Sequence, residues 1–179
     1  MDRIKLKKQL IDFTIQGVAE FLKNNSSLEF YAFAYDCNAE YAEVNLSFNT
    51  MEDFNETLKD YQNGRFSENY KTDEAIKNLK YNTGDWEYLC FDSINVLTEE
   101  ELNKIYNDFP DDDYKSWNIF VEELMELFCE SLIEFRNSKV YRSIPKSKDF
   151  ISFCIDHDED FEDAEKRLER VENKKSENQ

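Results

Sequence analysis

The residues best able to do chemistry in this chain lie in one acidic segment near the C-terminus, Asp156-His157-Asp158-Glu159-Asp160. Asp156, Asp158 and Asp160 have the spacing of the first, third and fifth ligands of a calcium loop. The pattern then fails, because Phe161 occupies the glycine position and Arg167 occupies the position of the bidentate glutamate. We therefore expect no bound metal and interpret the carboxylates as favouring the positive N-terminus of a following helix.

Catalytic motifs are not recognisable elsewhere. His157 is the single histidine, so a Ser-His-Asp or Cys-His site has one candidate imidazole, and nothing near it marks a nucleophile. Glycine occurs three times, at positions 17, 64 and 84, which excludes glycine-rich phosphate-binding loops. The sequence names no cofactor and leaves open whether the protein is an enzyme.

Negative charge is concentrated in the middle of the chain. The sequence has 40 Asp and Glu against 22 Lys and Arg, and residues 85–134 hold fifteen of the acidic residues against two lysines. Within a helix expected at 116–137, every fourth residue is acidic with no Lys or Arg interspersed: Glu122, Glu126, Glu130 and Glu134. Such a stripe costs a helix a few tenths of a kcal/mol per pair, roughly.

Two interpretations of this stripe remain open. Together with the preceding carboxylates Asp111, Asp112 and Asp113, it predicts a surface that binds a basic protein partner, since opposite charge speeds the encounter. The alternative is an ordinary solvated face. The net charge of −18 disfavours nucleic acid as the partner, because phosphates would be repelled. The oligomeric state is not predicted.

Hydrophobic periodicity and turn signals predict an α+β fold, a single domain with a small mixed β-sheet flanked by helices. The domain is expected to span residues 1–173, with 174–179 as a frayed C-terminal tail. Thr50 with Asp53, and Thr98 with Glu101, resemble helix-capping boxes. Helices are expected at 4–23, 50–61, 72–80, 98–109, 116–137 and 159–171, and strands at 28–36, 41–49, 86–91 and 150–155.

A second kind of site is conceivable around the predicted strand 86–91. Trp86 and Tyr88 would alternate onto one strand face, where they could form a stacking platform beside Asp156 and Asp158. That pocket would suit a small-molecule-binding domain or an enzyme of unknown reaction. Packing of the two aromatic side chains in the core is the alternative.

Compartment is indicated by the N-terminus and by cysteine usage. Polar residues interrupt residues 1–17, so neither a signal peptide nor a membrane span is expected. The four cysteines are far apart and each has apolar neighbours: Cys37, Cys90, Cys129 and Cys154. We expect reduced core thiols in a cytoplasmic protein.

Three segments together resemble the bacterial domain-of-unknown-function 4303 family. They are the early strand 30–35 (FYAFAY), the central pattern 80–88 (KYNTGDWEY), in which Tyr81 stands where the family often has Trp, and the late strand and acidic turn 151–160 (ISFCIDHDED). The resemblance implies a small cytoplasmic α+β protein without settled catalytic residues. It also implies an association with secreted toxins. Together with the acidic stripe, this favours a non-catalytic immunity-type protein that binds a basic toxin domain through that helix face.

Overall fold

The computed structural model describes residues 2–65, 67–110 and 114–177, and it has the expected α+β fold. Over these ranges no helix has the length and apolarity that a membrane span requires. The elements in chain order are α1 (Arg3–Asn24), β1 (Phe30–Asn38), η1 (Ala39–Tyr41), β2 (Glu43–Thr50), α2 (Met51–Asn63), η2 (Ser67–Tyr70), α3 (Asp73–Tyr81), η3 (Thr83–Asp85), β3 (Tyr88–Asn95), α4 (Glu99–Asn107), α5 (Tyr114–Phe135), α6 (Lys139–Ser143), β4 (Lys146–Asp156) and α7 (Phe161–Glu177).

The four strands form one mixed sheet in the order β3-β2-β1-β4. β1 is antiparallel to β2 and parallel to β4, and β2 is antiparallel to β3. Residues 30–35 are all buried, as is typical of an interior strand with side chains packed on both faces. The β1–β2 connection ends at Ala42 in the left-handed region (φ 50°), where its carbonyl accepts a 2.8 Å bond from Val96.

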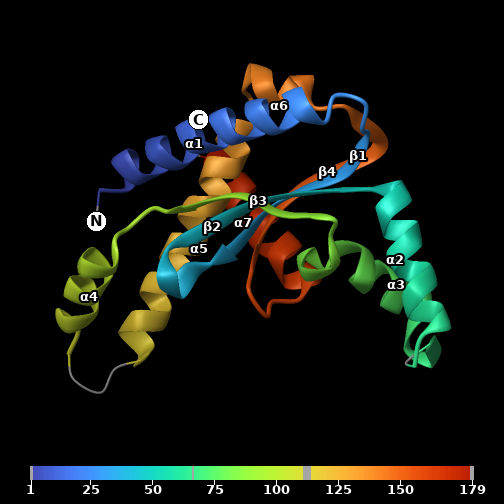
Figure 1. Ribbon diagram of the computed structural model, residues 1–179. Coiled ribbons are helices and arrows are strands. Elements are labelled where there is room, and N and C mark those ends of the chain that lie inside the picture. The colour runs from blue at the N-terminus through green and yellow to red at the C-terminus, as the bar shows by residue number, and fades with distance from the viewer. Residues whose placement is uncertain (1, 66, 111–113, 178–179) are drawn as a thin grey trace.

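One face of the sheet is covered by α1 and α5 (Figure 1). Phe21 of α1 stacks on Phe48 and Phe91, with ring centroids 5.4 Å and 4.3 Å away. Phe135 of α5 packs against Phe33 of β1 at 5.6 Å. These rings supply much of the buried apolar area and define the covered face.

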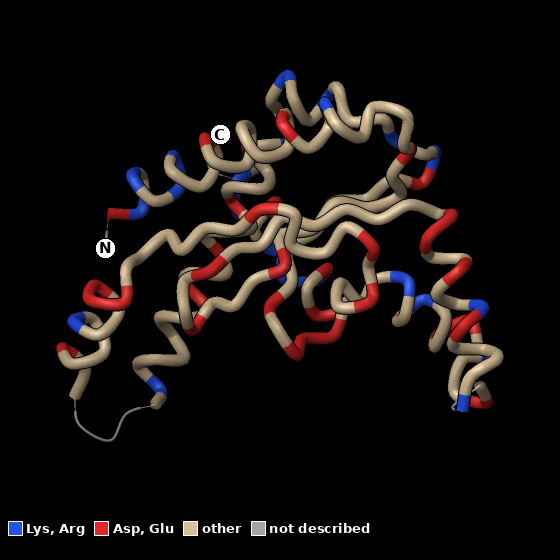
Figure 2. The backbone as a smooth tube through the Cα atoms, viewed as in Figure 1, with Lys and Arg blue, Asp and Glu red and all other residues tan. Residues whose placement is uncertain are grey.

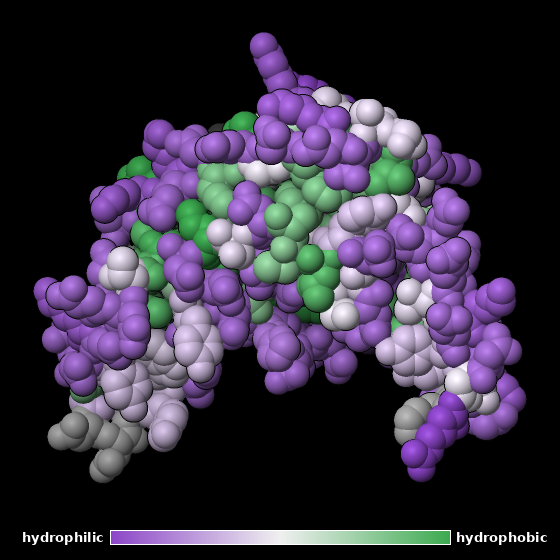
Figure 3. Space-filling view, viewed as in Figure 1, coloured by the Kyte–Doolittle hydropathy of each residue, from purple (hydrophilic) through white to green (hydrophobic). Residues whose placement is uncertain are grey.

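The opposite face is covered mainly at its β4 side, where α7 packs against the strand. Phe161 at the start of α7 meets Phe153 of β4 at 5.0 Å. Helices α4 and α2–α3 extend below the two ends of the sheet, so the molecule is arched and its lower surface is hollowed between them (Figures 1 and 3).

Several boundaries differ from expectation. The third strand begins at Tyr88, so Trp86 precedes it, and α6 was not expected. Helix α7 continues to Glu177, which makes residues 174–177 helical rather than frayed. The extension has a tertiary cause, because Lys174 bonds to Glu126 of α5 at 2.8 Å. The threonine caps at Thr50 and Thr98 are confirmed.

The aromatic core generates a stability prediction. Phe48→Ala should lower the free energy of unfolding by about 3–5 kcal/mol, since Phe48 is fully buried among four phenylalanine rings. Urea unfolding measures this. Ile119→Ala is the control, because Ile119 is 52% exposed and its truncation should cost less than about 0.5 kcal/mol. Equal losses in the two variants would contradict this assignment of the core.

Candidate functional site

The α5 stripe, Glu122, Glu126, Glu130 and Glu134, is engaged by cations from two other helices. α7 pairs with its first half and α1 with its second half. The nitrogen–oxygen distances are 2.6 Å for Arg170–Glu122, 3.7 Å for Arg167–Glu122, 2.8 Å for Lys174–Glu126, 3.6 Å for Arg170–Glu126, 2.9 Å for Arg3–Glu130, and 3.8 Å and 3.5 Å from Lys7 to Glu130 and Glu134. The Lys174 bond and nearby cations lower the pKa of Glu126.

The sequence is right that no Lys or Arg is interspersed in the stripe within α5. The cations come instead from α1 and α7, which the fold packs against that helix. The ion pairs account for the stripe's charge without any partner, and its role in partner binding stays a prediction. The other carboxylates assigned to it, Asp111, Asp112 and Asp113, lie outside the described residues.

The aromatic platform expected at Trp86 and Tyr88 does not form. Trp86 is buried: its indole N–H donates to the Lys80 carbonyl at 3.0 Å, and its ring meets Phe153 at 5.7 Å. Tyr88 packs instead against Phe21 on the covered face. The two side chains thus lie on opposite faces, because the strand begins only at Tyr88.

The acidic residues assigned to that pocket also separate. Asp156 accepts a hydrogen bond from the Ala39 amide at 3.0 Å, whereas the Asp158 side chain is 93% exposed on left-handed backbone (φ 66°). A cavity of about 410 Å³ beside this turn is lined by other residues, including Tyr81 and Asp85. Within the described ranges, no three His, Cys, Asp or Glu side chains are grouped to hold a metal ion.

The acidic turn is held by a buried ion pair between Glu159 and Arg167 of α7. Glu159 also accepts the Asp156 amide at 3.0 Å, which closes the turn. Burial disfavours the charge on Arg167, but the hydrogen bond and attraction from Glu159 outweigh it and raise the pKa of the guanidinium. The ion pair thereby holds the turn that carries His157 and Asp158.

The sheet face opposite α1 carries a polar surface that we call the open face, formed by Asp36, Glu43, Asn45, Ser47 and Cys90. Val44, Leu46 and Phe48 of β2 are buried on the covered face, so the alternating residues point the other way. Asp36 is the register partner of Asn45, which places it on the same side. The residues of the open face are half-buried or exposed, except Ser47, which is buried.

Cys90 reaches the open face through an irregularity in β3. The β2–β3 register shifts between Leu46 and Phe48, and Cys90 has a φ of 47°. Its amide donates to Ser47 Oγ at 2.9 Å and its thiol to Asn45 Oδ1 at 3.2 Å. This cysteine is exposed, which corrects the expectation that all four thiols are core residues.

The Cys90 thiol is poorly suited to nucleophilic attack. Partial burial raises its pKa, and the carboxylates of Glu43, Asp36 and Asp92 raise it further. The reactive form of cysteine is the thiolate, which this environment disfavours. The open face therefore holds its cysteine mainly as the neutral thiol.

The Asp36 carboxylate of the open face is half-buried, and its environment disfavours the ionised form. Burial raises its pKa above the ordinary 3.8, and the charges of Asp156 and Glu43 add to that effect. A hydrogen bond with Thr83 and the nearby His157 oppose the shift. The fold thus keeps a carboxylate where its charge is disfavoured.

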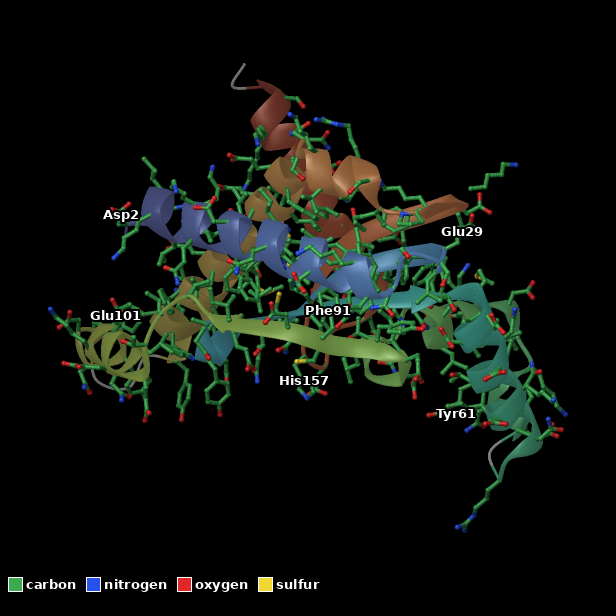
Figure 4. All side chains as sticks on the ribbon, turned by 45° about the horizontal axis from the view of Figure 1, so that its top comes forward. Asp2, Glu29, Tyr61, Phe91, Glu101 and His157 are labelled. Carbon is green, nitrogen blue, oxygen red and sulfur yellow. The ribbon has the colours of Figure 1, made fainter. Side chains whose placement is uncertain are left out.

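The carboxylates of the open face are not paired with a Lys or Arg of the described chain. Asp36 and Glu43 form no such ion pair, and the neighbour of opposite charge that acts on Asp36 is His157. Figure 2 shows acidic residues along the lower side of the sheet, and Figure 4 shows His157 below β3 and Phe91 toward α1. The alternation of Glu43, Asn45 and Ser47 was visible in the sequence, but only the strand register adds Asp36 and Cys90.

The fold and this surface define a class of small acidic α+β protein, with a sheet covered by helices on one face and lined by carboxylates on part of the other. The chain belongs to the family of the domain of unknown function DUF4303, whose model matches residues 10–173. This confirms the resemblance seen in the three sequence segments. No curated protein and no solved structure matches the chain.

Reversal of the α5 stripe should destabilise the fold. A variant with Glu122→Lys, Glu126→Lys, Glu130→Lys and Glu134→Lys would place four lysines against the cations of α1 and α7, and we expect a loss of about 2–4 kcal/mol in urea unfolding. The control reverses four exposed carboxylates that form no ion pair with a Lys or Arg of the described chain, Glu29, Glu56, Asp60 and Glu100. A similar loss in the control would mean that net charge, not pairing, is responsible.

Asp36→Asn should stabilise the protein at neutral pH. Because the folded-state pKa of Asp36 is raised, folding favours its protonated form, and the native protein loses that contribution as pH rises above about 4. The amide lacks this penalty, so the stability gain should be largest at pH 7 and vanish near about pH 3. Urea unfolding across this range measures the difference, with Asp158→Asn as the exposed control. A gain independent of pH would refute the electrostatic cause.

Proposed function

We propose that this protein is a non-catalytic interaction protein of the bacterial immunity type, acting in the cytoplasm, that binds a basic protein partner such as a toxin domain through the open face. The observation that carries the proposal is the contrast between two acidic surfaces. The α5 stripe is matched by cations of the same chain, whereas Asp36 and Glu43 of the open face form no ion pair with a Lys or Arg among the described residues.

The unfavourable electrostatics of the open face support a role in binding. The Asp36 carboxyl is half-buried, and the nearby charges of Asp156 and Glu43 disfavour its ionised form. A basic partner would relieve that repulsion and would be steered toward the surface by long-range attraction. The hollow between α4 and α2–α3 gives a protruding partner room to approach (Figure 3).

The cysteines support the cytoplasmic part of the proposal. Cys37, Cys129 and Cys154 are buried free thiols, and the sulfurs of Cys37 and Cys154 lie 3.6 Å apart without a disulfide bond. Neighbouring unbonded thiols suit a reducing compartment. Small-molecule binding or catalysis remains the alternative prediction, although the residues expected to form its pocket are dispersed.

Affinity capture from the source cells tests the proposal. The immobilised protein should retain a basic protein in near-equal amount at low salt and lose it at about 0.5 M salt, where the screening length falls to a few ångströms. Glu43→Lys with Asp36→Asn should reduce that protein about tenfold, as quantified by mass spectrometry.

A matched control separates local from overall charge. Glu29→Lys with Asp149→Asn changes the net charge equally, near the end of the sheet where β1 and β4 begin, far from Asp36. It should retain the partner. Equal capture by the open-face variant and the parent protein, or equal loss in the control, would overturn the proposal.

A further inference from the structure

A groove of about 800 Å³ lies beside the open face, between the β1–β2 connection, α4 and the start of α5. Leu97 and Leu102, both buried, are part of its lining. Asn95 links the two surfaces, because it is the register partner of Glu43 in the sheet and also lines the groove. A partner seated on the open face would therefore meet the groove.

Three aromatic side chains line the groove: Tyr41, Tyr106 and Trp117. Tyr41 is 62% exposed and Tyr106 is 51% exposed, so both rings offer contact area at the surface. Trp117 meets Tyr106 edge-to-face at 5.4 Å, and Phe120 supports it from the core side at 5.3 Å. The three rings therefore line the same groove.

The backbone under the exposed Tyr41 is anchored. Asn95 donates its side-chain amide to the Tyr41 carbonyl at 3.0 Å, and the next residue, Ala42, is tied to Val96 at 2.8 Å. The backbone that carries this ring is thus fixed before any partner arrives. Preorganised aromatic groups lose little conformational entropy on binding and are typical of interface hot spots.

The groove is acidic as well as aromatic. Glu40 and Glu99 line it, and the described residues of its lining include no Lys or Arg. A cation between aromatic rings and carboxylates gains both the attraction of the ring faces and the opposite charge. The chemistry of the lining therefore selects a positively charged group with a flat, stackable surface.

We infer that this groove receives an arginine side chain from the surface of the basic protein partner. The inference rests on the proposed function and deepens it, since it names the group that anchors the partner. A guanidinium stacks on aromatic rings and donates to a carboxylate in the same plane, whereas an ammonium is a compact, strongly hydrated charge. Arginine should thus be preferred to lysine.

Peptides of nine arginines and of nine lysines test the inference without knowledge of the partner. Both would interact with the acidic open face, but only the arginine peptide should quench Trp117 and bind about tenfold more tightly in a fluorescence titration. Trp86 is buried in the core and serves as a constant background. N-acetyl-arginine amide is the third probe and should bind far more weakly than the peptide.

Variants on the groove wall locate the binding. Tyr106→Ala and Glu99→Gln should each reduce arginine-peptide affinity toward that of the lysine peptide. The matched controls are Tyr114→Ala, an aromatic residue of α5 that is 76% exposed outside the groove, and Glu100→Gln on α4. Both controls should leave the preference for arginine unchanged.

The outcomes separate this inference from the proposed function. Equal affinity for the two peptides, or a preference unaffected by Tyr106→Ala, would overturn the groove inference. If the affinity for the peptides is nevertheless lost in the Glu43→Lys variant and at high salt, the proposed function is retained. Binding of N-acetyl-arginine amide as tight as that of the peptide would also overturn the inference, because it would indicate a small-molecule site.

Discussion

The ion pair between Arg167 and Glu159 is the contact on which the arrangement of the candidate surface depends. Both side chains are largely withdrawn from solvent, with 9% and 15% of their area exposed. A buried charge that loses its partner is strongly destabilising, so the two residues hold each other in place. Glu159 closes the turn after β4, while Arg167 also reaches Glu122 of α5. The pair therefore connects the sheet, α7 and α5.

The pairing of carboxylates with cations also distinguishes the two acidic surfaces of the protein. Cations from the two terminal helices meet the glutamates of α5, and these pairs join helices that are far apart in the sequence. The open face receives no such cations within the described chain, and burial raises the pKa of Asp36 although the Thr83 hydrogen bond and His157 oppose the shift. The carboxylates of α5 are thus paired within the fold, whereas those of the open face are not paired with a described Lys or Arg.

The open face and the groove would contribute differently to recognition. Exposed carboxylates mainly affect the rate and salt dependence of association, since water screens them. An aromatic groove with an acidic rim excludes more water and distinguishes one cation from another by shape. Their meeting at Asn95 and Glu43 places both properties on one continuous surface.

The sequence by itself determined the fold class, the family and most of the elements. Hydrophobic periodicity and threonine caps are local signals, and the helices after Thr50 and Thr98 begin where those signals lie. What only the tertiary structure decided is the environment of each charge. The sequence shows no cation beside Glu122, because its partner Arg170 is 48 residues away along the chain. Trp86 fits a strand pattern in the sequence, because its hydrogen bond to the Lys80 carbonyl leaves no periodic signal. Pairing and burial depend on distances in space, which a pattern along one chain does not contain.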